Sequence, residues 1–276
     1  MNELKKSDII LIIVLLAFST IVGSSIIIKR NLVSNENEDI IKPEIVYDTL
    51  TEISINDDIV KDNFAKVSKL DDFIFKYEGI TKDNIPNEFK LRAAYSNQEK
   101  DLVDLGEDYF NKTGQSYAIR LQDMYTEMKD LFGSNVSYTP EDFKLLEDDF
   151  STGDGLPKFI YNKSELRFET NFEFGGALRG FVNQEVIKAE AFKEELYIYV
   201  VPAFYKLQYS KYNGEFYDVY SEYDYEKEKF SNIIKEKVEY TYRIDSDITD
   251  KLTIYKYTFT KEDTGYKLIG IDKQEN

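Results

Sequence analysis

The sequence predicts an α+β protein, in which an N-terminal transmembrane helix is followed by a helical segment packed on a C-terminal antiparallel β-sheet. The first observation behind this prediction is an uncharged run of twenty residues near the N-terminus. The second is a helical spacing of apolar residues in the next part of the chain, and the third is a change to a two-residue period after it. Helices followed by strands indicate α+β architecture and not alternating βαβ units.

The uncharged run begins at Ile9 and ends at Ile28. A helix of that length covers about 30 Å, the thickness of the hydrocarbon core of a bilayer. The main alternative is a cleaved secretory signal, whose apolar region has only about 7 to 15 residues before a small-residue cleavage site. Here the charged residues Lys29 and Arg30 stand where that site would belong. We therefore predict an uncleaved membrane anchor over residues 9–28.

Two lysines precede the anchor and two basic residues follow it, so the charge bias across it is nearly balanced. The free amine adds a positive charge to the short N-terminal side, and long domains translocate largely regardless of their charge. We predict that residues 1–8 form a cytoplasmic tail and that the chain after the anchor is extracytoplasmic. Residues 29–52 begin polar and contain Pro43, and we interpret them as a stalk.

Residues 53–150 have the spacing of helices. A first helix is predicted after Asn56, and a second begins at Asn84, because Pro86 suits a first turn. A third apolar face ends near Gly114.

The clearest predicted helix runs over residues 116–132, where the apolar residues form one stripe. Gly133 is expected to end it. A capping-box spacing at Thr139 predicts one more short helix over residues 143–146. This part of the chain is therefore predicted to be helical up to residue 150.

Residues 151–276 have the two-residue period of strands and many tyrosines. Turn signals at Glu194, Gly214 and Gly265 predict three hairpins. Pro202 is expected at an edge or a bulge, since proline cannot donate to a ladder. The strands expected from this pattern cover residues 158–162, 165–174, 187–191, 196–201, 215–223, 252–260 and 266–271, whereas residues 230–239 are ambiguous.

The two parts are predicted to fold as one extracytoplasmic domain over residues 53–276. Only residues 147–157 lie between them, and no long linker rich in Gly, Ser or Pro separates the two parts. One face of the sheet needs a cover, which the apolar stripes of the helices can provide. The small side chains of Ala189 and Ala191 would let a helix approach the sheet closely.

The composition excludes several classes of function. The formal net charge of −17 disfavours nucleic acid and anionic lipid as partners, because both are bound through positive charge. The chain has no Cys and no His, which removes thiol nucleophiles, imidazole bases, and thiolate and imidazole metal sites. No nucleophile-elbow, P-loop or dinucleotide-binding motif is present. We predict no cofactor, no metal site and no catalytic residue.

A carboxylate-dependent hydrolase acting on cell-wall glycans remains an alternative. Such enzymes use two acidic residues that the fold, and not the spacing in sequence, brings together. A pocket with two facing carboxylates would favour this alternative, and its absence would favour a non-enzymatic binding or interaction module at the cell surface.

A cluster of tyrosines supplies the candidate binding residues. We assign partner binding to Tyr197, Tyr199, Tyr217 and Tyr220, because a tyrosine offers a flat apolar face and a polar tip to a glycan or to another surface protein. The competing interpretation is that tyrosine simply suits half-buried strands.

Several segments also resemble a recurring kind of protein in low-GC Gram-positive bacteria. They read DDIVKDNF, NIPNEFKLRAAYSN, MKDLFG up to Tyr138, FEFGGALRG and KYTFTKEDTGYKLIGIDK. These proteins are uncharacterised, and each has a single N-terminal anchor, an outside helical segment and a tyrosine-rich C-terminus. The last segment is also similar to the end of cone-shaped α+β domains of the nuclear transport factor 2 type. The resemblance implies a location and an architecture, not an activity.

Overall fold

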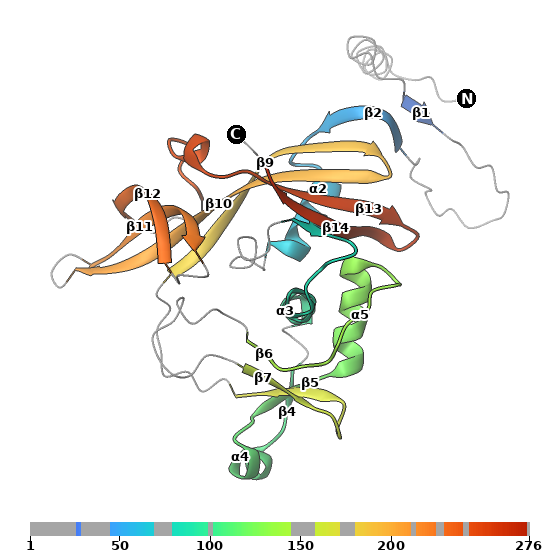
Figure 1. Ribbon diagram of the computed structural model, residues 1–276, viewed down its shortest axis with the longest axis vertical. Helices are drawn as coiled ribbons and strands as arrows, with labels where there is room; N and C mark the ends of the chain where they lie inside the picture. The colour runs from blue at the N-terminus through green and yellow to red at the C-terminus, as the bar shows by residue number, and fades with distance from the viewer. Residues whose placement is uncertain are drawn as a thin grey trace, which may run out of the picture.

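The structure is a computed structural model with two antiparallel sheets, and helices α3 (Asn87–Gln98) and α5 (Leu121–Phe132) lie between them (Figure 1). The α+β class and the antiparallel C-terminal sheet are therefore as predicted. The residues that the structure describes are 26–28, 45–68, 79–98, 102–144, 158–171, 180–210, 214–224, 229–239 and 243–274.

The large sheet has nine strands in the order β1-β2-β9-β10-β13-β14-β3, with β11 beside β10 and β12 beside β11. Its strands are β1 (Ile26–Ile28), β2 (Ile45–Ile53), β3 (Ile80–Thr81), β9 (Gly180–Lys193), β10 (Glu195–Ser210), β11 (Gly214–Asp224), β12 (Lys229–Val238), β13 (Tyr255–Glu262) and β14 (Gly265–Lys273). The three predicted hairpins are present as β9–β10, β10–β11 and β13–β14.

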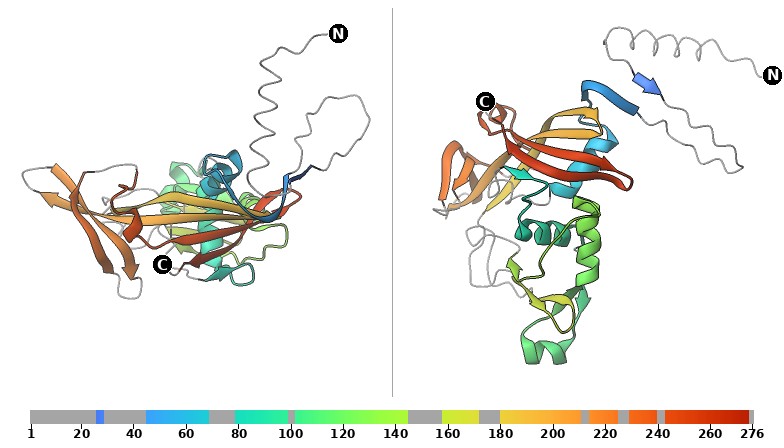
Figure 2. Two further views of the ribbon diagram at one scale, coloured as in Figure 1. Left: turned by 90° about the horizontal axis from the view of Figure 1, so that it is seen from above. Right: turned by 45° about the vertical axis from the view of Figure 1, so that its right-hand side comes forward.

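The long strand β10 organises this sheet. Along one edge it pairs with β9, while its other edge pairs with β13 up to Val200 and with β11 from Phe204. Pro202 lies between these two partners, two residues after a register shift at Tyr199 and Val200. A residue without an N–H donor is tolerated at such a change of partner. Beyond it, β11 and β12 extend away from the helices (Figure 2).

The small sheet has five strands in the order β4-β5-β8-β7-β6 and lies on the other side of the helices (Figure 1). Its strands are β4 (Val103–Asp104), β5 (Tyr117–Arg120), β6 (Phe143–Lys144), β7 (Lys158–Asn162) and β8 (Arg167–Thr170). The described helices are α2 (Asp58–Val67), α3 (Asn87–Gln98), α4 (Glu107–Thr113) and α5 (Leu121–Phe132), with a short 3-10 turn at Thr249–Lys251.

Helix α3 lies between two apolar cores. Phe89 and Ala93 face the large sheet with residues of α2 and α5, whereas Leu91 and Tyr95 face the small sheet with Met124. A helix buried on both sides has no need of a polar face, which explains why α3 lacks a clear amphipathic stripe. The helical part therefore packs on the large sheet, as predicted, and also carries a second sheet.

Three sequence predictions are wrong within the helical part. Residues 117–120 form strand β5 and not the first turn of a longer helix, and residues 143–144 form strand β6 and not a helix. The prediction that residues 53–150 are helical also missed β4. Strand β4 pairs with β5, while β5 pairs with β8 and β6 pairs with β7, so the small sheet joins segments from both sides of residue 150. Periodicity is a local signal, and it does not report a hydrogen-bonding partner that is distant in sequence.

The predicted stalk over residues 29–52 is wrong in its last part. Residues 45–52 belong to strand β2, which pairs with β9 around Ala191. Residues 29–44 lie outside the described part of the chain.

The predicted transmembrane helix falls mostly on residues 1–25, which the structure does not describe. Its last three residues, Ile26–Ile28, form strand β1 and pair with Ile45, Val46 and Tyr47 of β2, so the prediction of a helix up to Ile28 is wrong at that end. None of the helices described here has both the length and the apolar character needed to cross a bilayer.

Candidate functional site

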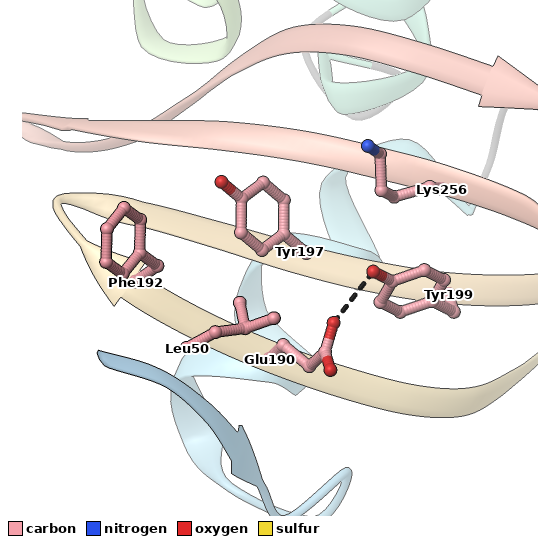
Figure 3. Close-up of a pocket in the computed structure, with 6 residues that line it drawn as sticks. All are labelled: Leu50, Glu190, Phe192, Tyr197, Tyr199 and Lys256. Atoms are coloured by element: carbon pink, nitrogen blue, oxygen red, sulfur yellow. Dashed lines mark hydrogen bonds between the residues drawn. The ribbon is translucent and has the colours of Figure 1, made fainter. Parts of the chain in front are cut away.

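The structure separates the four predicted binding tyrosines into two pairs. Tyr197 and Tyr199 lie on β10 and line a pocket on the open face of the large sheet (Figure 3). Tyr217 and Tyr220 lie on β11 and do not contribute to this pocket.

Tyr217 and Tyr220 instead pack among aromatic rings on opposite faces of their strand. The Tyr217 ring centroid lies 5.2 Å from that of Phe181, and the Tyr220 ring centroid lies 5.2 Å from that of Phe230. For Tyr217 and Tyr220, this packing supports the interpretation that tyrosine suits half-buried strands.

The pocket around Tyr197 and Tyr199 has a volume of about 410 Å³. We call it the tyrosine hollow, and it is lined by Leu50 of β2, Glu190 and Phe192 of β9, Tyr197 and Tyr199 of β10, and Lys256 of β13. All six side chains stand on one face of four adjacent strands, with Glu190 between Leu50 and the two tyrosines (Figure 3).

Strand alternation places these residues on the face that the helices do not cover. Leu196 and Ile198 point into the core against the helices, so Tyr197 and Tyr199 point to the opposite face. Farther along β10, that opposite face is covered, because Val201, Ala203 and Tyr205 pack against Ile248 and its neighbours. Among the residues that the structure describes, the tyrosine hollow is thus the uncovered end of this sheet face.

Glu190 is the buried charge of the hollow, with 8% of its surface exposed. Its Oε1 accepts a hydrogen bond from the Lys188 ammonium at 2.7 Å, and its Oε2 accepts one from the Tyr199 hydroxyl at 2.7 Å. Burial acts to raise the pKa of Glu190, but these two hydrogen bonds and the charges of Lys188 and Lys256 lower it below its usual value. Glu190 is therefore a carboxylate at neutral pH.

The two tyrosines are neutral hydrogen-bond donors. Burial, followed by the hydrogen bond that its hydroxyl donates to Glu195, raises the pKa of Tyr197 to about 12. Burial and the neighbouring Glu190 carboxylate likewise raise the pKa of Tyr199. Neither hydroxyl is a base or a nucleophile at neutral pH.

Each aromatic ring of the hollow has a lysine ammonium near it. Lys188 lies 5.2 Å from the ring centroid of Tyr199, and Lys256 lies 5.5 Å from that of Tyr197. Lys193 lies 5.0 Å from the ring centroid of Phe192. Ammonium groups at such distances are attracted to the ring quadrupole.

Sequence reasoning identified two of the six lining residues. Glu190 and Phe192 could also have been predicted, because the β9–β10 hairpin register sets Tyr197 opposite Glu190 and Glu195 opposite Phe192. Leu50 and Lys256 belong to strands that are far from β10 in sequence, so no local pattern places them beside the tyrosines.

A second buried carboxylate, Glu169, lies in the small sheet and not in the hollow. Its Oε1 accepts hydrogen bonds from Tyr109 at 2.7 Å, Asn162 at 2.9 Å and Arg167 at 2.7 Å. These bonds tie α4 to β7 and β8, which is a structural role. Within the described ranges, no three acidic side chains gather in a way that would hold a metal ion.

No family model matches the chain, and no curated protein or solved structure is significantly similar to it.

Proposed function

We propose that this protein is a membrane-anchored extracytoplasmic binding module, that it is not an enzyme, and that its ligand contacts the tyrosine hollow. The proposal rests on a pocket that no described segment covers and that is lined by aromatic rings around a buried carboxylate. Small-ligand sites are concave, mostly apolar and supplied with a few placed polar groups, and the hollow has each of these properties.

The packing of the surrounding sheet supports this proposal. The large sheet covers its Val201 end with Ile244, Ile248 and Leu252, yet it leaves Leu50 57% exposed at the hollow. An exposed leucine beside half-buried aromatic residues costs solvation free energy that a bound partner would recover.

The alternative is a carboxylate-dependent hydrolase, for which the hollow gives less support. Glycoside hydrolysis needs two carboxyl groups that flank the scissile bond, and one of them must be protonated. Glu190 is the single acidic residue among those that line the hollow, and its lowered pKa keeps it charged. Glu52 is opposite Glu190 in the β2–β9 ladder but is exposed, and it does not line the hollow.

Photo-crosslinking on intact cells tests the binding function. A benzoylphenylalanine at Leu50, which lines the hollow, is expected to form a crosslinked product that disappears when Tyr197 is also changed to alanine. The matched control carries the same probe at Ile233 on β12, which is 47% exposed and distant from the hollow in the fold. Equal products from both positions, or products insensitive to Tyr197→Ala, would show that the hollow is not the binding site.

The location of the domain is tested separately. The uncharged residues 9–25, which precede β1, support a single span, and the long chain that follows supports an extracytoplasmic domain. Protease added to intact, wall-stripped cells is expected to degrade the chain beyond about residue 50 and to spare a tag placed before Lys5. Protection of the domain in these cells would contradict the proposed location.

A further inference from the structure

The charges around the tyrosine hollow are balanced. Glu190 is paired with Lys188 at 2.7 Å, and Lys256 lies 3.8 Å from Asp272. With Lys193 beside Phe192 and Glu195 beside Tyr197, three positive and three negative side chains therefore border the hollow. A site built to bind a charged ligand is expected to carry an excess of the opposite charge, and this one carries none.

A cationic ligand is also disfavoured by the lysines themselves. Lys188, Lys193 and Lys256 each place an ammonium within 5.5 Å of one of the three rings. These ammonium groups already provide the cation–π contacts that would select a quaternary amine. A second cation would meet their repulsion at short range.

An anionic ligand meets the opposite obstacle. Glu190 is buried in the hollow as a carboxylate, and Glu195 accepts the hydrogen bond of Tyr197 beside it. The whole chain has a formal net charge of −17, which repels an approaching anion.

The polar groups of the hollow still offer both kinds of hydrogen bond. A carboxylate has about four lone-pair positions, and Lys188 and Tyr199 occupy one position on each oxygen of Glu190, so Glu190 can accept further bonds. The Lys256 ammonium lies beyond hydrogen-bond distance of Asp272, so it can donate to a ligand. Sugar hydroxyls both donate and accept, and the apolar face of a sugar ring packs on aromatic rings such as Tyr197 and Tyr199.

From this combination we infer that the tyrosine hollow binds a neutral saccharide. The sugar ring lies against the aromatic side chains, Glu190 accepts from its hydroxyls, and Lys256 donates to them. This inference rests on the proposed binding function and specifies its ligand class.

The test is calorimetric titration of the full chain in lipid nanodiscs, since a maltoside detergent would itself present a sugar. The neutral probes are cellotetraose, maltotetraose and the tetramer of N-acetylglucosamine, and the charged probes are tetragalacturonate and choline. At least one neutral probe is expected to bind, with an affinity that stays constant from about 0.05 to about 0.5 M salt, because no net charge is neutralised. Neither charged probe is expected to bind.

Variants assign the binding to the hollow. Tyr197→Ala is expected to weaken the neutral saccharide about tenfold or more, because stacking on an aromatic ring is lost. Leu50→Lys replaces an apolar contact of the hollow with a hydrated ammonium at an exposed position, so it is expected to weaken binding about tenfold while the chain stays folded. Tyr125→Ala is the matched control, because Tyr125 stacks on Tyr138 from helix α5 and should leave the affinity unchanged.

Preferential binding of choline or tetragalacturonate would overturn the inference, as would failure of all three neutral probes. If the neutral probes fail but the crosslink from position 50 persists and depends on Tyr197, the ligand class is wrong and the binding function stands. If both fail, the proposed function fails as well.

Discussion

At the scale of single residues, a lysine removed from water joins three elements of the fold. Lys267 of β14 has 1% of its side chain exposed and donates to the backbone oxygen of Asp130 at 2.7 Å and to its Oδ1 at 3.1 Å. Lys66 of α2 donates to the second carboxylate oxygen at 2.8 Å. A buried ammonium is stable only when it is paired in this way, so Asp130 on α5 holds α2 and β14 together.

Asp130→Ala is expected to lower the free energy of unfolding by about 2–3 kcal/mol, because Lys267 stays buried without its charge partner. The matched control is Asp123→Ala, which removes the partner of Arg120, a side chain that is 74% exposed. An exposed pair contributes less than about 1 kcal/mol. Urea denaturation of both variants measures these losses of unfolding free energy. Equal losses in the two variants would contradict the role assigned to Lys267.

The same carboxylate predicts a pH dependence. Burial acts to raise the pKa of Asp130, but the hydrogen bonds and charges of Lys66 and Lys267 lower it below its usual value of 3.8. A pKa that is lower in the folded chain adds stability above the usual value, and that stability is lost as the pH falls through the folded value. The stability difference between the parent chain and Asp130→Ala is therefore expected to be constant well above the usual pKa of 3.8 and to shrink as the pH falls below that value. A stability difference that grows in acid would show that the pKa of Asp130 is raised in the folded chain and not lowered.

At the scale of elements, the sequence predicted what is local. The β9–β10 and β13–β14 hairpins follow from alternation around turn residues, and α5 ends at Gly133 as expected. The sequence did not predict strand β5, because buried apolar residues such as Ala118 and Ile119 fit a helix as well as a strand. Only the pairing of β5 with β8 distinguishes the two structures. A partner that is distant in sequence thus overrides local periodicity.

Gly133 gives the sharpest prediction at this scale. It has a φ of 93° and a ψ of 165°, a conformation that is accessible essentially to glycine alone. An added Cβ would also lie 2.6 Å from Oε1 of Glu262, but that atom ends a side chain that can rotate away. Gly133→Ala is therefore expected to cost about 1–3 kcal/mol of stability through the backbone. The double variant with Glu262→Ala should be equally destabilised in thermal denaturation, and recovery of stability would show that the contact dominates.

At the scale of the whole molecule, two cores share the helices α3 and α5. Met124 and Met128 of α5 pack toward the small sheet, whereas Leu131 of the same helix packs toward the large one. Composition and periodicity predicted one core beneath one sheet. The second sheet depends on the pairing of β5 with β8, and the tyrosine hollow depends on the pairing of β2 and β13 with their neighbours, which no local pattern specifies.

This arrangement predicts that the two sheets lose stability together. Met124→Asp would bury an unpaired carboxylate at a fully enclosed site, at a cost of several kcal/mol. Hydrogen exchange is expected to lose protection in β7 and β8 and also in β10 and β13. Thr126→Asp, at an exposed position on the same helix, is the control. If β10 and β13 keep their protection, the two cores unfold independently and the single-domain prediction for residues 53–276 is wrong.

The strand β1 has a consequence for how far the domain can reach. Its three residues pair with β2 in antiparallel register, with Ile26 beside Tyr47. In a chain held by its N-terminal segment, a pull on the anchor therefore enters the sheet at Tyr47, and residues 29–44 lie outside the load path. Breaking that short ladder would add those residues to the tether, which is about 55 Å of chain at full extension. The three-residue ladder would thus decide whether the domain is held close to the N-terminal segment or can extend away from it.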